Sequence, residues 1–280
     1  MSPLWRDEIG IYVAPHKLAL TRLARGVKPK SVGEAGWSNE LANDAHWGAA
    51  LNALDALLAK SEWQKAVARV VISDHWVRYA IVPFSAALSG EGERMTHARH
   101  VLTGIYGEVV SQWTITLSDN RPGTAQVACA VPTTLIEELQ IMLGRHQLPL
   151  KSFQPQLVSA FNHWRGKLPD GGAWFVSIEQ GSLSAARLAP GSWDRVHSVR
   201  IGADWAVELR RLQTFGRLAN NQTQQGPSQG QGQRSSVYVD APAALRIAAG
   251  TTGADLIWLD EDTAGESTAG RLEFMRRHQA

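Results

Sequence analysis

Cysteine is almost absent from this sequence of 280 residues, which contains only Cys129. A single cysteine excludes a disulfide framework, and its place in an apolar run predicts a small buried side chain in a cytoplasmic protein. Long apolar runs are also lacking. No stretch approaches the ~20 residues that span a bilayer, and residues 1–10 have no apolar signal core. We therefore expect no direct membrane span, and any link to a membrane should run through a partner.

The chain also lacks a strong excess of positive or negative charge. The formal net charge is +2, charged residues make up 19% of the chain, and the basic residues are scattered rather than clustered. This pattern argues against nucleic acid as a partner. Hydrophobic residues make up 44%, enough for a sizeable core in one large domain or two closely packed lobes.

Tryptophan is abundant, with eleven residues. An aromatic array of this kind can stack on sugars or bases, but most of these residues fall in periodic segments, which favours packing in the core or between lobes. These residues are Trp5, Trp47, Trp76, Trp113, Trp164, Trp174, Trp205 and Trp258.

Alternating apolar residues bounded by turn residues predict a series of strands. They cover residues 9–14, 18–24, 68–73, 75–82, 112–118, 126–131, 174–178, 183–188, 196–201, 236–240 and 255–259. Asp74 is predicted to form a turn between two of these strands. Each half of the chain opens with a hairpin or meander and continues into helix and strand, a weak internal repeat that indicates two similar lobes facing a cleft.

Apolar residues at helical spacing predict the helices. They cover residues 47–58, 94–109, 134–146, 155–164, 204–215 and 242–249. Thr134 and Glu137 have the spacing of a capping box. The predicted stripe of the second helix is Ala98, Val101, Leu102, Ile105 and Val109.

This order of elements resembles the actin-like fold, and more narrowly the PilM, MshI and GspL group of type IV pilus and type II secretion assembly proteins. The hairpin of residues 9–23, the segment of residues 70–83 that ends at Pro83, and the meander of residues 174–202 carry the resemblance. It implies an α/β, ribonuclease-H-like fold of two lobes. Residues 1–168 would form the first lobe with an inserted subdomain. Residues 169–260 would form the second lobe, with a flexible loop at 220–234, and residues 261–280 a polar tail.

Members of this group that bind ATP have two turns with an Asp-x-Gly pattern, at which phosphate and Mg²⁺ are held. In the first turn of this chain Tyr12 stands in place of the Asp and Ala14 in place of the Gly. Pro15 then removes an N–H that could bind phosphate. In the second turn Ser177 replaces the Asp, and Glu179 puts a carboxylate where phosphate would lie.

On the adenosine side, Asp240 lies in residues 239–243, where the group has a Gly-rich turn. The resemblance therefore implies a degenerate nucleotide cleft, no cofactor and no enzymatic activity. Lys17, in the first turn, could contact phosphate if nucleotide still binds. ATP and Mg²⁺ are expected only under that alternative.

Other constellations are weaker. Ser73, Asp74 and His75 are consecutive, and on a strand neighbouring side chains point to opposite faces, so turn chemistry is favoured over a catalytic triad. His97 and His100 could share a metal, but no further ligand surrounds them and no metal site is predicted. The acidic cluster at residues 260–262 is predicted to be a hydrated tail.

The resemblance implies a cytoplasmic scaffold, peripheral to the inner membrane, that binds the cytoplasmic tail of an inner-membrane pilus or secretion assembly protein. An assembly ATPase is a second expected partner. The alternative function is a nucleotide-binding switch or ATPase with divergent phosphate turns. A sugar-kinase-like enzyme is disfavoured because no Asp or Glu lies in a sequence pattern that indicates a catalytic carboxylate.

Overall fold

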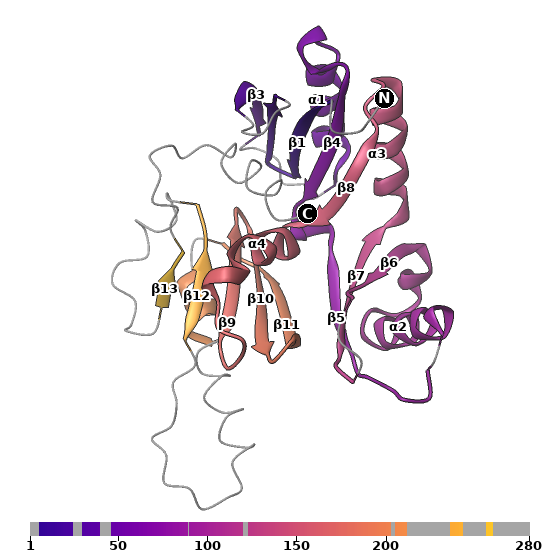
Figure 1. Cartoon of the computed structure of the whole chain (residues 1–280), viewed down its shortest axis with the longest axis vertical. Coiled ribbons are helices and arrows are strands. Elements are labelled where there is room, and N and C mark those ends of the chain that lie inside the picture. The colour runs from indigo at the N-terminus through magenta and orange to yellow at the C-terminus, as the bar shows by residue number, and fades with distance from the viewer. Residues whose placement is uncertain are drawn as a thin grey trace, which may run out of the picture.

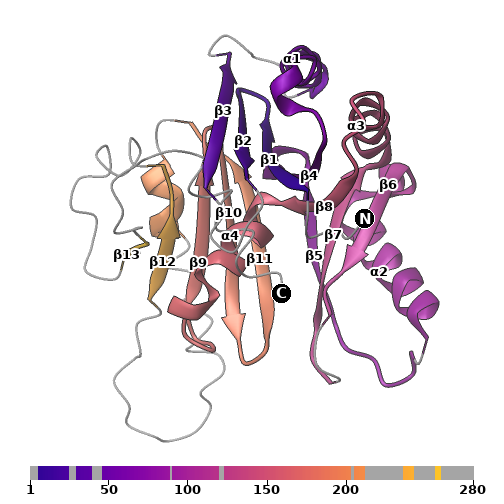
Figure 2. The same cartoon turned by 45° about the horizontal axis from the view of Figure 1, so that its top comes forward.

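In the computed structural model, the described residues are 6–24, 30–39, 46–88, 90–119, 123–202, 205–211, 236–242 and 256–259. They form two five-stranded sheets and one three-stranded sheet (Figures 1 and 2). The predicted loop at 220–234, the predicted helix at 242–249 beyond its first residue, Trp5, and the acidic cluster at 260–262 lie outside the described residues. No helix among those described is long and apolar enough to cross a bilayer.

The first sheet is built from the N-terminal half. Its strands, in order across the sheet, are β3 (Ser31–Ser38), β2 (Lys17–Leu23), β1 (Asp7–Ala14), β4 (Ala66–Ile72) and β8 (Leu150–Pro155). The first three strands are antiparallel, whereas β4 and β8 run parallel to β1. The hairpin of β1 and β2 and the strand β4 confirm the sequence prediction.

The second sheet repeats this plan. Its strands, in order, are β11 (Ser192–Arg200), β10 (Ser182–Ala189), β9 (Trp174–Glu179), β12 (Val237–Asp240) and β13 (Leu256–Trp258). Again an antiparallel meander of three strands is followed by two strands parallel to the first of them. The two sheets thus have the same topology, which confirms the internal repeat.

The three-stranded sheet is inserted between β4 and β8. It consists of β5 (Arg78–Val82), β7 (Gln126–Pro132) and β6 (Trp113–Leu117), with the helix α2 (Glu91–Tyr106) and the short helix η4 (Glu108–Gln112). Ala98 and Leu102 of α2 are buried as predicted. Ile105 and Val109 are 58% and 42% exposed. The helix ends before Gly107, which has a φ of 78°, so that Val109 no longer continues the stripe.

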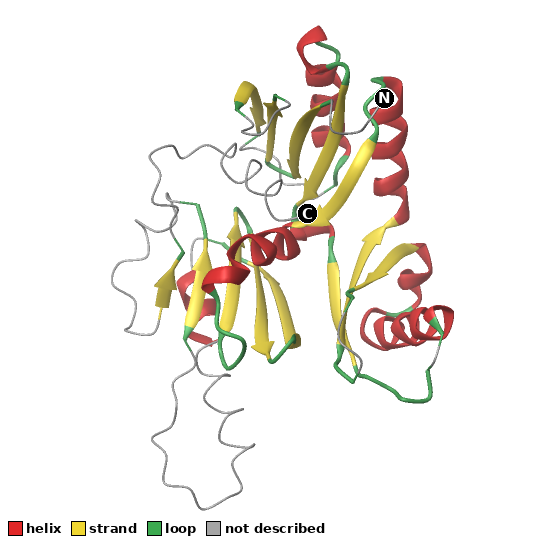
Figure 3. Cartoon of the chain, in the orientation of Figure 1, coloured by secondary structure: helices red, strands yellow, loops and turns green. Residues whose placement is uncertain are grey.

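Helices join the sheets into one body. They are α1 (Gly48–Leu58), α3 (Thr133–Arg145) and α4 (Gln156–Trp164), with the 3-10 helices η2 (Ser61–Trp63) and η5 (Arg165–Lys167). Figure 3 shows α4 between the two large sheets. The predicted capping box of α3 is wrong. The helix begins at Thr133, so Thr134 lies inside its first turn, and no side chain caps it.

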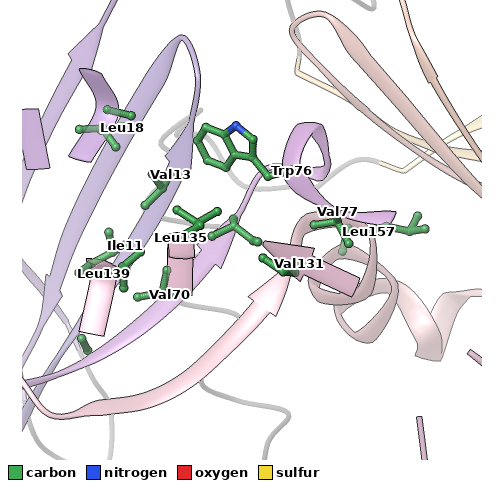
Figure 4. Close-up of a cluster of buried hydrophobic side chains, with 14 of the residues drawn as sticks. Ile11, Val13, Leu18, Val70, Trp76, Val77, Val131, Leu135, Leu139 and Leu157 are labelled. Carbon is green, nitrogen blue, oxygen red and sulfur yellow. The ribbon is translucent and has the colours of Figure 1, made fainter. Parts of the chain in front are cut away.

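One hydrophobic core runs from the first sheet through the helices to the second sheet. Ile11, Val13 and Val70 pack with Leu135 and Leu139 of α3 in Figure 4. The same core includes Leu157 of α4 and, from the second sheet, Phe175, Ala186 and Trp193. The outer face of the second sheet packs instead on Trp205 and Leu209 of the helical residues 205–211.

The tryptophans confirm the prediction of packing where they are described. Six are at most 6% exposed: Trp63, Trp76, Trp164, Trp174, Trp193 and Trp205. Trp37, Trp47, Trp113 and Trp258 are partly buried against the cores.

Candidate functional site

The site lies where β1, β4 and β9 end between the two large sheets. After Ile72 the chain turns through the short helix η3 (Asp74–Trp76), in which the N–H of His75 donates to the Oγ of Ser73. The N–H of Ser73 donates to the carbonyl of Val13 at 2.8 Å, which holds this turn against β1. The predicted turn at Asp74 is therefore confirmed, and it faces the end of β9.

Glu179, the last residue of β9, forms the contact between the two sheets. Its Oε1 is hydrogen-bonded to the Tyr12 hydroxyl of β1. Its Oε2 accepts from the Ser73 Oγ at 3.1 Å and from the Asp74 N–H at 3.0 Å. Glu179 is 5% exposed. Two sequence-predicted cleft residues from different lobes, Tyr12 and Glu179, thus meet directly.

Asp74 forms the second buried carboxyl centre. Its Oδ1 accepts from the Tyr79 hydroxyl of β5 at 2.5 Å, and its Oδ2 accepts from the N–H of Leu157 in the first turn of α4 at 3.0 Å. A further hydrogen bond comes from Ser184 of β10. Asp74 therefore links the first sheet, the inserted sheet, α4 and the second sheet.

Burial dominates the acidity of both carboxyl groups. It raises the pKa of Glu179 from 4.5 to about 8, and the charge of Asp74 acts in the same direction. It also raises the pKa of Asp74 from 3.8 to about 6, against the hydrogen bonds of Tyr79, Leu157 and Ser184. At neutral pH the neutral form of Glu179 therefore predominates.

Ser73 and His75 are in contact, whereas the Asp74 carboxyl group is bonded to Tyr79 and Leu157, so the three side chains do not form a triad. The Ser73 Oγ, which caps η3, lies 2.9 Å from the His75 Nδ1. With the Ser73 proton donated to Glu179, the Nδ1 of His75 must itself be the donor to Ser73. This is the reverse of the direction in which a base activates a serine, and Ser73 is 0% exposed. The constellation is therefore structural.

The remaining predicted residues surround this contact. Ala14 and Pro15 are buried at the turn that follows β1, and Lys17 is exposed. Ser177 and Asp240 are register partners on β9 and β12, and both are buried. The Ser177 Oγ has no hydrogen-bond partner among the described residues.

A row of polar side chains crosses one face of the second sheet. Ser198, Ser184, Ser177 and Asp240 are successive register partners on β11, β10, β9 and β12, and the Oγ atoms of Ser184 and Ser198 are 3.0 Å apart. Neither Ser184 nor Tyr79 was predicted from the sequence to be a site residue. Their only signal was a polar residue at an inward position of an apolar strand.

Metal ligands do not gather in the part of the chain that the structure describes. No group of three His, Cys, Asp or Glu side chains there could hold a metal ion. His97 is half-buried and His100 is exposed on α2, away from this site. Burial raises the pKa of the Cys129 thiol to about 12.

Comparison by sequence finds no matching family model and no matching curated protein. Comparison by structure finds several. A chain of the PilM–PilN type IV pilus biogenesis complex superposes with a TM-score of 0.57 at 13% identity, over 90% of this chain and 88% of that one. The cytoplasmic domain of EpsL, an inner-membrane component of the type II secretion system of Vibrio cholerae, gives 0.54 at 8% identity, over 97% and 94%.

A third similar structure is described by its fold. A Bacteroides thetaiotaomicron protein with an actin-like ATPase fold superposes with a TM-score of 0.55 at 8% identity, over 88% of this chain and 86% of that one. This chain has the actin-like fold. In the actin-like chain the contact between Tyr12 and Glu179 lies between the two repeated sheets, at the ends of their first strands.

Proposed function

We propose that this actin-like chain is a non-catalytic scaffold of a bacterial pilus or type II secretion assembly platform. It acts on the cytoplasmic side of the inner membrane and binds the cytoplasmic tail of a membrane-anchored assembly protein. Through that partner it is peripheral to the membrane, and an assembly ATPase is the second partner to which it would couple the complex.

The observation that carries the proposal is the contact between Tyr12 and Glu179. By the resemblance to the PilM, MshI and GspL group, these two residues stand in the two turns at which ATP-binding members hold phosphate and Mg²⁺. In this structure their side chains are hydrogen-bonded to each other, and Ser73 and Asp74 donate to the remaining carboxyl oxygen. A phosphate placed there would have to displace a hydrogen-bonded side chain from each lobe.

The residues of the first turn are also a poor fit to a Mg²⁺–nucleotide. Pro15 has no N–H to donate to phosphate, and it is buried beside Ala14. Glu179 would add negative charge beside phosphate whenever it is ionised. The network therefore replaces a ligand between the lobes with protein groups, which favours a fixed scaffold over a nucleotide-driven switch.

The likeness to known assembly proteins supports the choice of machine. It extends over 90% and 97% of this chain for the structures from the PilM–PilN complex and the EpsL cytoplasmic domain. At 13% and 8% identity this likeness reports the fold, and the assignment to a pilus or secretion machine is our inference from it.

Nucleotide binding provides the first test. We expect no rise in melting temperature with millimolar ATP and Mg²⁺, whereas ligand at 100 times its Kd would stabilise the fold by about 2.7 kcal/mol. Lys17→Ala, at the first turn, and Lys60→Ala, exposed elsewhere on the surface, form a matched pair of variants. A rise that is lost only in Lys17→Ala would favour the nucleotide-binding switch instead.

Partner binding provides the second test. We expect the chain to co-purify with an inner-membrane protein of a pilus or type II secretion system, and to release it when the partner's cytoplasmic tail is deleted. Deleting the gene for this chain should reduce surface fibres or secretion. A deletion strain with normal fibres and normal secretion would contradict the proposal.

A further inference from the structure

The strand β3 is an open edge of the first sheet. It is the outermost strand, beside β2 (Figure 2), and no strand that the structure describes pairs with its outer side. An open edge presents a row of backbone N–H and C=O groups to which a strand of another chain can bond. The eight residues of β3 include no proline, lysine or arginine.

The other sheet edges in the described part of the chain have features that oppose such pairing. β8 contains Lys151 and ends at Pro155, and β6 and β13 have only five and three residues. β5 and β11 lie against each other. Short length, charge, proline and cover are the usual protections of an edge strand. β3 has one charge, that of Glu34, and a bulge at Val32, which leaves residues 33–38 in regular register with β2.

The hydrogen-bond pattern shows which backbone groups of β3 face outward. The N–H of Asn39 donates to the carbonyl of His16 at 3.0 Å. Hydrogen-bonded and non-hydrogen-bonded pairs alternate along antiparallel strands, so Trp37 and Ala35 bond to β2 as well. Gly36 lies between them. Its N–H and C=O therefore point away from β2, and the residue is exposed.

The side chains of β3 are complementary to a second copy of the same strand. In an antiparallel pairing centred on Gly36, this residue lies opposite its own copy. Glu34 then lies opposite Ser38 of the second copy, whose hydroxyl can donate to the carboxylate. Trp37 lies opposite Ala35, which places a large side chain beside a small one. Cross-strand pairs of these kinds stabilise a sheet.

The neighbouring registers are less favourable. A pairing centred on Glu34 would place two carboxylates directly opposite each other, which is destabilising. A pairing centred on Ala35 would extend into the bulge at Val32 and would bring the two carboxylates into diagonal positions. A pairing centred on Trp37 would join only three residues of each strand. Charge and strand regularity therefore both favour Gly36 as the centre.

We propose that β3 pairs with β3 of a second copy of this chain, antiparallel about Gly36, so that the two five-stranded sheets become one continuous sheet. An interface in which the same surface is used by both copies closes on itself and gives a dimer rather than a filament. No residue of the candidate site belongs to β3. The dimer is therefore independent of the proposed scaffold role.

Sedimentation equilibrium of the purified chain at a series of concentrations measures the pairing. We expect a monomer–dimer equilibrium in the wild type and in Gly36→Ala, which keeps the outward N–H and whose Cβ would lie 3.4 Å from the carbonyl oxygen of Leu18, an ordinary contact. Gly36→Pro removes the N–H from both copies and should weaken dimerisation about tenfold or more. Its fold should persist, because β2 does not bond to this N–H and an outward position on an edge strand tolerates proline.

Cysteine substitutions test the register without relying on the proline variant. In Gly36→Cys the two Cα atoms would be about 5.5 Å apart, a separation that a disulfide can span, so mild oxidation should link the two copies. Ser38→Cys is the matched control, exposed on the same strand. In this register Ser38 and its copy are separated by about 13 Å along the strand, so it should give far less linked dimer. Cys129 should contribute little, because burial raises the pKa of its thiol to about 12.

Two kinds of result would overturn the proposal. The first is a wild-type chain that stays monomeric at every concentration at which it is soluble. The second is a dimer that Gly36→Pro leaves intact, or that Ser38→Cys links as readily as Gly36→Cys, because such a dimer uses another surface or register. These measurements use the purified chain alone, so their failure leaves the scaffold proposal untouched. Failure to bind a membrane-anchored partner would equally leave the dimer untouched.

Discussion

Replacing Glu179 by Gln should change how stability depends on pH. Burial and the charge of Asp74 raise the pKa of Glu179 from 4.5 to about 8 in the folded chain. Between these values the folded state holds a proton that the unfolded state has lost, so stability falls as pH rises and levels off above pH 8. Each unit of difference corresponds to about 1.4 kcal/mol, so the loss over this window is about 4–5 kcal/mol.

In Glu179→Gln the amide can replace the neutral carboxyl group of Glu179 without leaving a polar group unpaired. Its oxygen accepts from Ser73 and from the Asp74 N–H, as Oε2 does, and its NH₂ donates to the Tyr12 hydroxyl oxygen. We therefore expect Glu179→Gln to match wild type near pH 5 and to exceed it increasingly toward pH 8. Because the charge of Asp74 acts on Glu179, the difference reports Glu179 together with its effect on Asp74.

Urea unfolding at a series of pH values from 5 to 9 measures this difference. Glu137→Gln, on the exposed face of α3, is the matched control because it removes a carboxylate that water solvates in both states. It should keep the wild-type profile. Parallel profiles for Glu179→Gln and wild type, or a Gln variant as destabilised at pH 5 as at pH 8, would refute the reasoning.

Three further changes test neighbouring features of the chain. Tyr12→Phe should destabilise the fold by about 1–2 kcal/mol at pH 7 and by more above pH 8, where ionised Glu179 loses a donor; urea titration at both pH values measures this. Gly181→Ala should destabilise the fold by about 1 kcal/mol or more, because the φ of Gly181 is +79° and the new Cβ would lie 3.2 Å from His75. The control Gly92→Ala, in α2 with open space around it, should be neutral or should stabilise the fold by up to about 1 kcal/mol. Thermal unfolding of both variants measures this. Deleting residues 220–234, still a prediction of a loop, should leave solubility and melting temperature unchanged, and a large drop in either would mean that the segment packs.

The sequence by itself determined the elements whose pattern is local. The alternation in residues 9–24 and 174–201 and the apolar spacing of residues 47–58 specify their own strands and helix, and the structure confirms them. The internal repeat could be inferred for the same reason. Two strands were missed, β3 and β8. The exposed edge strand β3 has little apolar alternation, and β8 carries polar residues and ends at Pro155, so each depends on pairing with β2 or β4.

Only the tertiary structure decided the site. Sequence reasoning marked Tyr12 and Glu179 one by one, but the two residues are 167 positions apart, and no local pattern encodes their hydrogen bond. The sequence placed a turn at Asp74, but the hydrogen bonds of Ser73 to His75 and Glu179 depend on the cap of η3 and on the second lobe. The raised pKa of Glu179 follows from burial between lobes. Burial, long-range pairing and the neighbours of a charge are properties of the folded chain, and the order of residues fixes them only through the whole fold.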